Sequence, residues 1–229
     1  MLYCTFNLTL SHCILSSLLL TDLIFYPTPI TSHSFYNVGS LVGLLMLSQL
    51  ISGVLLACFY IPALVLAFNS VSYLMHSVNY GWAVRYLHST GASFFFTCSY
   101  LHIVRGIYYG SYQNQRNSVY FSGIILFTFS LFAAFIGYVL PFSQVSYYAA
   151  IVITNNLSIL PFIGLSLIHC LWGGFNVCAP TLVRFYSLHF ILGFWMVALA
   201  FLHLVLLHNI GSSSPLFGGL QKELVLFHP

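Results

Sequence analysis

The stretch Arg85–Arg105, RYLHSTGASFFFTCSYLHIVR, contains two histidines 14 residues apart. One arginine lies three residues outside each histidine, and no other Asp, Glu, Lys or Arg occurs between the two arginines. A helix that crosses the hydrocarbon core of a bilayer needs about 20 mostly apolar residues. The stretch therefore predicts a membrane-spanning helix that carries two buried histidines, His88 and His102.

The composition of the whole chain agrees with a membrane location. Its 229 residues are 60% hydrophobic and 3% charged, whereas a soluble domain carries about 25% charged residues. So few charges exclude a soluble globular protein, and the apolar content excludes a disordered chain. The chain also lacks the basic patch of a nucleic-acid-binding protein. Long apolar runs, rather than short alternating segments, favour membrane helices over a β-barrel.

Four spans are predicted, at about residues 37–61, 82–109, 119–139 and 181–208. The expected fold is an all-α integral membrane bundle of four transmembrane helices, with short surface helices within residues 142–178. We expect those surface helices to roof a site at the membrane surface. Residues 1–36 are expected to form an interfacial segment, and residues 209–229 a tail that leads to a missing second half.

The fourth span repeats the histidine spacing of the second, because His189 and His203 are also 14 residues apart. At about 100° and 1.5 Å per residue, both members of a pair lie on one helix face, about 21 Å apart along the axis. With four spans the second and fourth helices are parallel. His88 should therefore lie at the depth of His189, and His102 at the depth of His203, which predicts two bis-histidine sites stacked across the membrane.

Two histidines at each level indicate haem iron. Zinc prefers four protein ligands, whereas the iron of a haem needs only two axial ligands. No CxxCH motif for covalent attachment is present, so two b-type haems are predicted.

Two further sets of residues follow the same pattern. Four glycines repeat at a spacing of 14 on the first and third spans, where a missing side chain leaves room for a flat macrocycle; close helix packing is the alternative explanation. These are Gly39, Gly53, Gly123 and Gly137. Arg85 and Arg105, one turn outside the histidines, are expected to meet haem propionates, because an intramembrane arginine needs a partner.

Several motifs together resemble mitochondrial cytochrome b, the di-haem subunit of quinol–cytochrome c oxidoreductase (complex III). They are Val78–Trp82 (VNYGW), His102–Gly106 (HIVRG), Gly137–Pro141 (GYVLP) and Trp172–Phe175 (WGGF). The resemblance extends from about residue 22 to the end of the chain. It implies that the chain corresponds to the N-terminal, di-haem half of that family.

The resemblance also implies roles for individual residues. His88 and His189 would ligate the low-potential haem, and His102 and His203 the high-potential haem. Arg85 would contact propionates of the first haem, and Arg105 and Ser111 those of the second. Ser40 and His208 are similar to quinone-reduction-site residues. The residues similar to walls of the quinol-oxidation pocket are Phe135, Tyr138, Ala149 and Ile153.

By the same resemblance, the chain would belong to a proton-translocating enzyme that oxidises ubiquinol at one membrane face and reduces ubiquinone at the other. The expected partners are a Rieske iron–sulfur protein, a cytochrome c-type subunit and membrane lipids, in a dimeric multi-subunit complex of the mitochondrial inner membrane. Because the family is about twice this length, we also expect a companion chain that carries the second half. No nucleic-acid partner is expected.

Three alternatives remain open from the sequence. The chloroplast-type cytochrome b is disfavoured, because that relative has one extra residue between the two ligands of its fourth helix, whereas both spacings here are 14. A proton channel or a non-catalytic structural subunit would not account for the repeats on all four spans.

The chain also departs from the family at Ala149, where glycine is usual, and this predicts weak inhibition by methoxyacrylate-type inhibitors.

Overall fold

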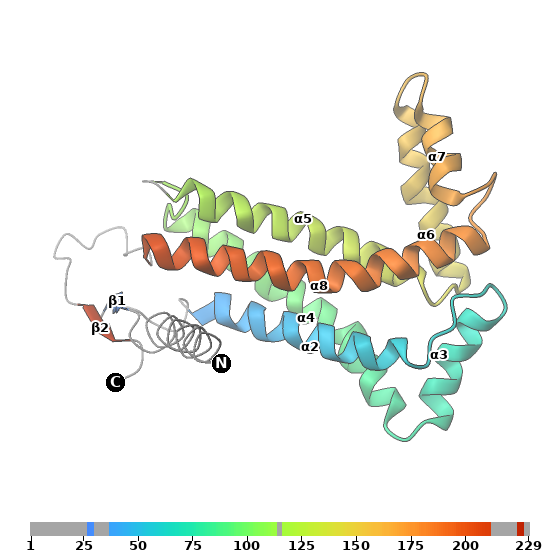
Figure 1. Cartoon of the computed structure of the whole chain (residues 1–229), viewed down its shortest axis with the longest axis horizontal. Helices are drawn as coiled ribbons and strands as arrows, with labels where there is room; N and C mark the ends of the chain where they lie inside the picture. Colours follow the sequence, from blue (N-terminus) through green and yellow to red (C-terminus); the bar gives the residue numbers. More distant parts are fainter. Residues whose placement is uncertain (1–26, 30–36, 114–115, 212–223, 227–229) are drawn as a thin grey trace, which may run out of the picture.

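The computed structural model describes residues 27–29, 37–113, 116–211 and 224–226. Four long helices run side by side and form the body of the molecule (Figure 1). They occupy the four ranges in which spans were predicted, as α2 (Val38–Ala57), α4 (Gly81–Tyr108), α5 (Asn117–Val139) and α8 (Ala179–Ile210). The predicted all-helical membrane fold is confirmed. The interfacial segment predicted for 1–36 and the tail predicted for 209–229 lie largely outside the described residues.

Three of the helices in the described ranges, α2, α5 and α8, are long and apolar enough to cross a membrane. Helix α4 has 28 residues, which is about 42 Å and also long enough. Its two arginines, two histidines and several hydroxyl side chains make it less apolar than the other three. It packs along α2, as α5 packs along α8.

The remaining elements are short. Helices α3 (Leu66–Ser77), α6 (Gln144–Asn155) and α7 (Gly164–Trp172) gather at one end of the bundle, with a 3-10 turn at Asn156–Ile159 (Figure 1). Strands β1 (Pro27–Pro29) and β2 (Leu224–Leu226) pair antiparallel at the other end. The predicted surface helices are therefore present. However, α6 and α7 extend sideways from the bundle instead of covering its end, which differs from the expected roof.

Helix ends follow the local sequence. Pro180 lies in the first turn of α8, where its missing N–H removes no helical hydrogen bond. The Cys178 N–H donates to Thr181 Oγ1 at 3.1 Å and closes a capping box. Helix α7 ends at Gly173, whose φ of 73° suits a residue without a side chain. These caps set the start of α8 and therefore the depth of its histidines.

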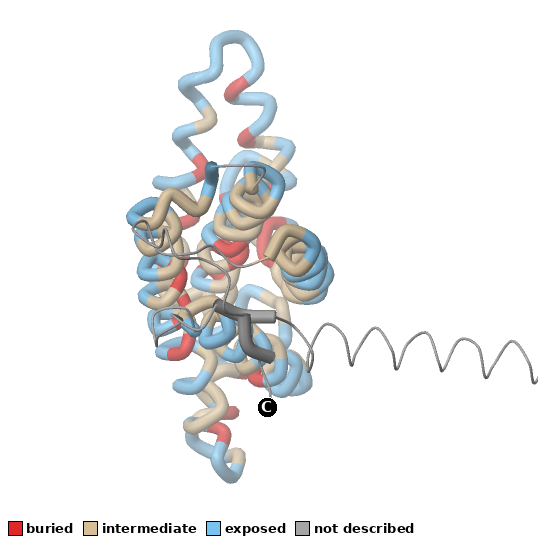
Figure 2. The backbone as a smooth tube through the Cα atoms, turned by 90° about the vertical axis from the view of Figure 1, so that its left-hand side faces the viewer, coloured by how far each residue is buried: buried red, intermediate tan, exposed pale blue. Residues whose placement is uncertain are grey.

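A compact hydrophobic cluster joins α5, α6 and α7 to the start of α8. It is built around Ile136, Ile168, Trp172 and Phe185, each at most 7% exposed. The Trp172 indole N–H donates to Thr154 Oγ1 at 2.9 Å and fixes α7 to α6. Along the rest of the bundle few residues are buried (Figure 2), as expected for helices that face lipid.

Candidate functional site

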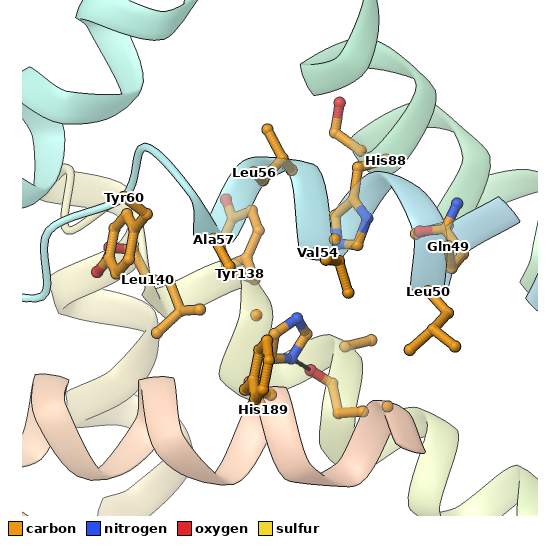
Figure 3. Close-up of a pocket in the computed structure, with 18 of the residues that line it drawn as sticks. Gln49, Leu50, Val54, Leu56, Ala57, Tyr60, His88, Tyr138, Leu140 and His189 are labelled. Atoms are coloured by element: carbon orange, nitrogen blue, oxygen red, sulfur yellow. Dashed lines mark hydrogen bonds between the residues drawn. The ribbon is translucent and has the colours of Figure 1, made fainter. Parts of the chain in front are cut away.

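The four histidines of the two repeats face one another in two pairs. The ring centres of His88 on α4 and His189 on α8 are 6.2 Å apart, with an interplanar angle of 82°. Those of His102 and His203, on the same two helices, are 6.5 Å apart at 76°. Figure 3 shows His88 and His189 pointing toward one another across a pocket. Because α4 packs on α2 and α8 packs on α5, each pair bridges the two halves of the bundle.

Each imidazole lies against a glycine of its neighbouring helix. A Cβ atom on Gly53 or Gly39 of α2 would lie 3.1 Å from Cε1 of His88 or His102, respectively. The glycines of α5 meet the histidines of α8 in the same way, with distances of 3.3 Å from Gly123 to His203 and 2.5 Å from Gly137 to His189. The glycine repeat therefore makes room for the histidine rings themselves, a contact that spacing alone does not predict.

Three of the four imidazoles have a described hydrogen-bond partner at Nδ1. His88 Nδ1 lies 3.0 Å from the hydroxyl oxygen of Ser52. His203 Nδ1 lies 2.8 Å from the hydroxyl oxygen of Ser122. His189 Nδ1 donates to the carbonyl oxygen of Ala133 at 2.9 Å. Such contacts fix a ring's orientation and direct its other nitrogen, Nε2, to a metal.

A mostly apolar cavity of about 290 Å³ surrounds His88 and His189. Arg85, Gln49 and Tyr138 are among its polar lining residues (Figure 3 labels the last two). A second cavity, of about 360 Å³, lies between α3, α4 and the start of α6 and shares Arg85 and Tyr138 with the first. Arg85 therefore contributes to both spaces, at the end of the bundle where His88 and His189 lie.

The histidine pairs fit haem iron better than zinc. Within residues 37–113 and 116–211, no group of three or more His, Cys, Asp or Glu side chains is arranged to hold a metal, so each level supplies two ligands. Two imidazoles bound coaxially by metal–nitrogen bonds of about 2 Å, with each nitrogen about 1.1 Å from its ring centre, have centres about 6 Å apart. The observed separations of 6.2 and 6.5 Å match this value. A macrocycle would complete the coordination.

Tyr60, just beyond α2, closes one edge of the first cavity. Its hydroxyl donates to the carbonyl oxygen of Leu140 at 2.6 Å, and its ring centre lies 5.3 Å from that of Tyr186. Burial raises the pKa of Tyr60, and the neighbouring Tyr186 raises it further. The phenol therefore remains protonated and joins the end of α2 to the end of α5.

The expected oxidation-pocket residues separate in the structure. Tyr138 lines both cavities. Phe135 instead packs its ring on Phe185, with ring centres 6.0 Å apart. Ala149 and Ile153 lie on α6, where Ala149 is partly buried and Ile153 is 47% exposed.

The residues expected at the opposite end also occupy definite places. Ser40 is in the first turn of α2, Ser111 follows α4, and His208 is in the last turn of α8. All three are at the end of the bundle nearer His102 and His203. Arg105, in the last turn of α4, lies 5.9 Å from the Tyr109 ring centre. Arg184 has a structural role, because it donates to the carbonyl oxygens of Cys170 and Leu171 at the end of α7.

Sequence reasoning missed Ser52, Ser122 and Gln49. A signal for the serines was present, because each immediately precedes a glycine of the 14-residue repeat, Gly53 or Gly123. Gln49 lies one turn before Gly53 and reaches the backbone of α4, where its side-chain amide donates to the His88 carbonyl oxygen at 2.8 Å and accepts from the Ala92 N–H at 3.3 Å. Nothing in its spacing distinguishes it from an ordinary polar residue of a span.

Comparison with known proteins gives consistent matches. Residues 23–211 match the family model described as cytochrome b/b6/petB. A cytochrome b of Phytophthora megasperma is 48% identical over 215 residues, which cover 94% of this chain and 56% of that protein. A cytochrome b of Rickettsia bellii (strain RML369-C) is 49% identical, with 89% and 52% covered.

A solved structure described as a hyperthermophilic respiratory complex III contains a similar chain. The two chains superpose with a TM-score of 0.82 at 29% identity, covering 93% of this chain and 58% of the other. The chain thus spans about half the length of the curated relatives it matches.

Proposed function

Since this chain belongs to the cytochrome b/b6/petB family, we propose that it is the di-haem, electron-transferring part of a respiratory quinol–cytochrome c oxidoreductase. The family implies haem b, and the described helices make the chain a multi-pass membrane protein. The proposed reaction oxidises ubiquinol at one membrane face and reduces ubiquinone at the other, with proton translocation. The observation that carries the proposal is the arrangement of the two histidine pairs at 6.2 and 6.5 Å.

We propose that His88 and His189 would hold the iron of one haem b, and His102 and His203 that of the other. When bound, each haem supplies an iron centre that accepts and releases one electron. The chain's own contribution is to hold neutral imidazoles at a fixed separation in apolar surroundings. Arg85 borders the first site, where its positive charge suits a propionate. Arg105 and Ser111 are proposed for the same role at the second site.

The two quinone sites are proposed at opposite ends of the bundle. Tyr138 lines the cavities at the end where α3 and α6 lie, which supports quinol oxidation there together with Phe135, Ala149 and Ile153. Ser40 and His208 lie at the other end and are assigned to quinone reduction. An oxidised quinol releases protons that a base must accept, and residues 37–113 and 116–211 contain no Asp or Glu. We therefore propose that a carboxylate outside this part of the chain accepts them at the oxidation site.

We further propose a location in the mitochondrial inner membrane and assembly with a Rieske iron–sulfur protein, a cytochrome c-type subunit and lipids in a dimeric complex. Relatives occur both in Phytophthora and in the bacterial genus Rickettsia, so fractionation of the source cells is the test of the location.

A redox titration of the haem absorbance tests the haem assignment. The protein in its native membranes should show two components. Replacing His88 or His189 with Gln should remove one component, and replacing His102 or His203 should remove the other, because each pair loses an axial ligand. His169→Gln on α7, whose ring packs on Phe175 instead, is the control and should keep both. A single component in the unmodified protein would contradict the proposal.

A further inference from the structure

The hydroxyl groups of Ser52 and Ser122 have the same relation to their histidines, although they come from different helices. Each lies on the residue before a glycine that clears the imidazole ring. Each places its oxygen within 3.0 Å of an Nδ1 atom, of His88 in one case and of His203 in the other. The two contacts join α2 to α4 and α5 to α8, one at each level of the bundle.

The direction of these hydrogen bonds follows from the helix backbone. A serine hydroxyl has a single hydrogen to donate. The Ser52 hydroxyl directs it to a backbone carbonyl of its own helix, with Ser48 O at 2.6 Å and Gln49 O at 3.2 Å. The Ser122 hydroxyl donates to Val119 O at 2.8 Å. Each oxygen must therefore accept from the imidazole, so Nδ1 carries the proton and Nε2 keeps a free lone pair.

The partner of His189 enforces the same tautomer. A carbonyl oxygen can only accept, so the contact with Ala133 O requires a proton on His189 Nδ1. His88, His189 and His203 are thus each held, by a different hydrogen bond, in the tautomer that leaves Nε2 available to a metal. All three hydrogen bonds are made by groups of the protein itself.

We propose that Ser52 and Ser122 are positioning residues that fix the tautomer and orientation of His88 and His203 and strengthen their donation to iron. The inference rests on the proposed haem ligation. An acceptor at Nδ1 makes the opposite nitrogen more basic. A more basic axial ligand stabilises ferric over ferrous iron and lowers the reduction potential. Removing the acceptor should therefore raise the potential.

The two levels should respond unequally. The His88/His189 pair has two described acceptors, Ser52 and the Ala133 carbonyl. For the other pair, Ser122 is the acceptor at His203, while His102 Nδ1 is buried with no partner among the described residues. Ser122→Ala removes the described acceptor of its pair, whereas Ser52→Ala leaves the Ala133 carbonyl in place. The larger shift is expected for Ser122→Ala.

The test is a redox titration of both haem components in native membranes that carry each variant. We expect Ser122→Ala to shift the ferric–ferrous equilibrium of the component assigned to His102 and His203 toward ferrous by up to about tenfold, which is about 59 mV for one electron. Ser52→Ala should shift the component assigned to His88 and His189 in the same direction by less. Ser52→Thr and Ser122→Thr keep the hydroxyl and should restore the original potentials. Thr128→Ala, whose exposed hydroxyl donates to Ile124 O, should shift neither.

The cysteine variants keep the measurement decisive if an alanine variant fails to accumulate haem. Ser52→Cys and Ser122→Cys fill the same space with a weak acceptor and should show the same shifts. Unchanged potentials of both components in the variants that bind haem would overturn the inference while leaving the haem assignment intact. Equal shifts in Thr128→Ala would overturn it as well. Absence of two components in the unmodified protein would instead contradict the proposed function.

Discussion

Single methyl groups decide whether the histidines can take their positions. A Cβ on Gly137 would come within 2.5 Å of His189 Cε1, whereas one on Gly123 would lie 3.3 Å from His203 Cε1. The first contact cannot be accommodated without moving the ring, and the second requires a shift of a few tenths of an ångström. Gly43, on α2, has nothing within 4 Å of its Cβ position. A side chain is therefore tolerated least well at Gly137, better at Gly123, and without a clash at Gly43.

Gly137→Ala is expected to remove or strongly weaken the haem component assigned to His88 and His189. Overpacking by one carbon costs about 1–3 kcal/mol in a packed core, and here it acts directly on a ligand ring. Gly123→Ala should weaken the other component mildly, and Gly43→Ala should change neither. Haem content per chain, measured by absorbance after purification, checks the series. Equal loss in all three variants would show that helix packing, not ring clearance, explains the glycines.

Ala149 carries a methyl group where the resembled family usually has glycine, and the structure places it partly buried on α6. A rigid inhibitor that packs on this backbone would have to move, at a cost of about 1–3 kcal/mol, which is about a 5- to 150-fold loss of affinity. A flexible quinol can shift instead. Ala149→Gly should therefore increase the affinity for methoxyacrylate-type inhibitors with little change in quinol turnover. Inhibitor titration of both forms decides it, and equal affinities would mean that the methyl does not intrude.

At the level of the elements, the bundle consists of two helix pairs, α2 with α4 and α5 with α8. The histidine sites lie between the pairs, so contacts that cross between them control the width of the sites. Tyr60 makes such a contact near the cavity that holds His88 and His189, through its hydrogen bond to Leu140 O. Because the phenol donates this hydrogen bond, the contact needs the protonated form.

Tyr60→Phe is expected to lower thermal stability by about 1 kcal/mol, because the Leu140 carbonyl loses its donor. The folded pKa of Tyr60 is raised above its ordinary value of 10.0. Its contribution is therefore fully present below about pH 10 and is lost only as the pH rises further. The difference in melting temperature between the two forms should stay constant from about pH 6 to 9. The exposed Tyr73 supplies the control variant, Tyr73→Phe. A similar loss of stability in Tyr73→Phe would contradict the account. So would a difference in melting temperature between Tyr60→Phe and the unmodified protein that varies between about pH 6 and 9.

On the scale of the whole molecule, the outer surface is largely apolar. Leu44, Phe121 and Trp195, on three different spans, are 64%, 66% and 61% exposed, and exposed residues, in pale blue, recur along the whole bundle in Figure 2. A water-soluble protein rarely shows apolar patches of this extent, so lipid is the solvent that these side chains suit. Among the polar side chains of α4, Ser99 is buried, whereas Ser89 and Thr97 are exposed.

The membrane class, the four helices and the depth at which the histidines pair could be predicted from the sequence. The reason is that the rise and rotation of a helix are fixed by its backbone, so a spacing of 14 between His88 and His102 converts directly into a face and a depth. Chain order then makes α4 and α8 parallel and matches His88 to His189. These steps need only local geometry and connectivity.

Only the tertiary structure decided which atoms meet across the helices. The glycines clear the imidazoles of α4 and α8, and Ser52 and Ser122 accept from Nδ1. Phe135 lies on Phe185 instead of the cavity, and α6 and α7 extend sideways instead of forming a roof. Each of these depends on the separation of two helices and the rotation of each about its own axis. Both quantities are set by the packing of side chains distant in sequence, so spacing within one helix does not contain them.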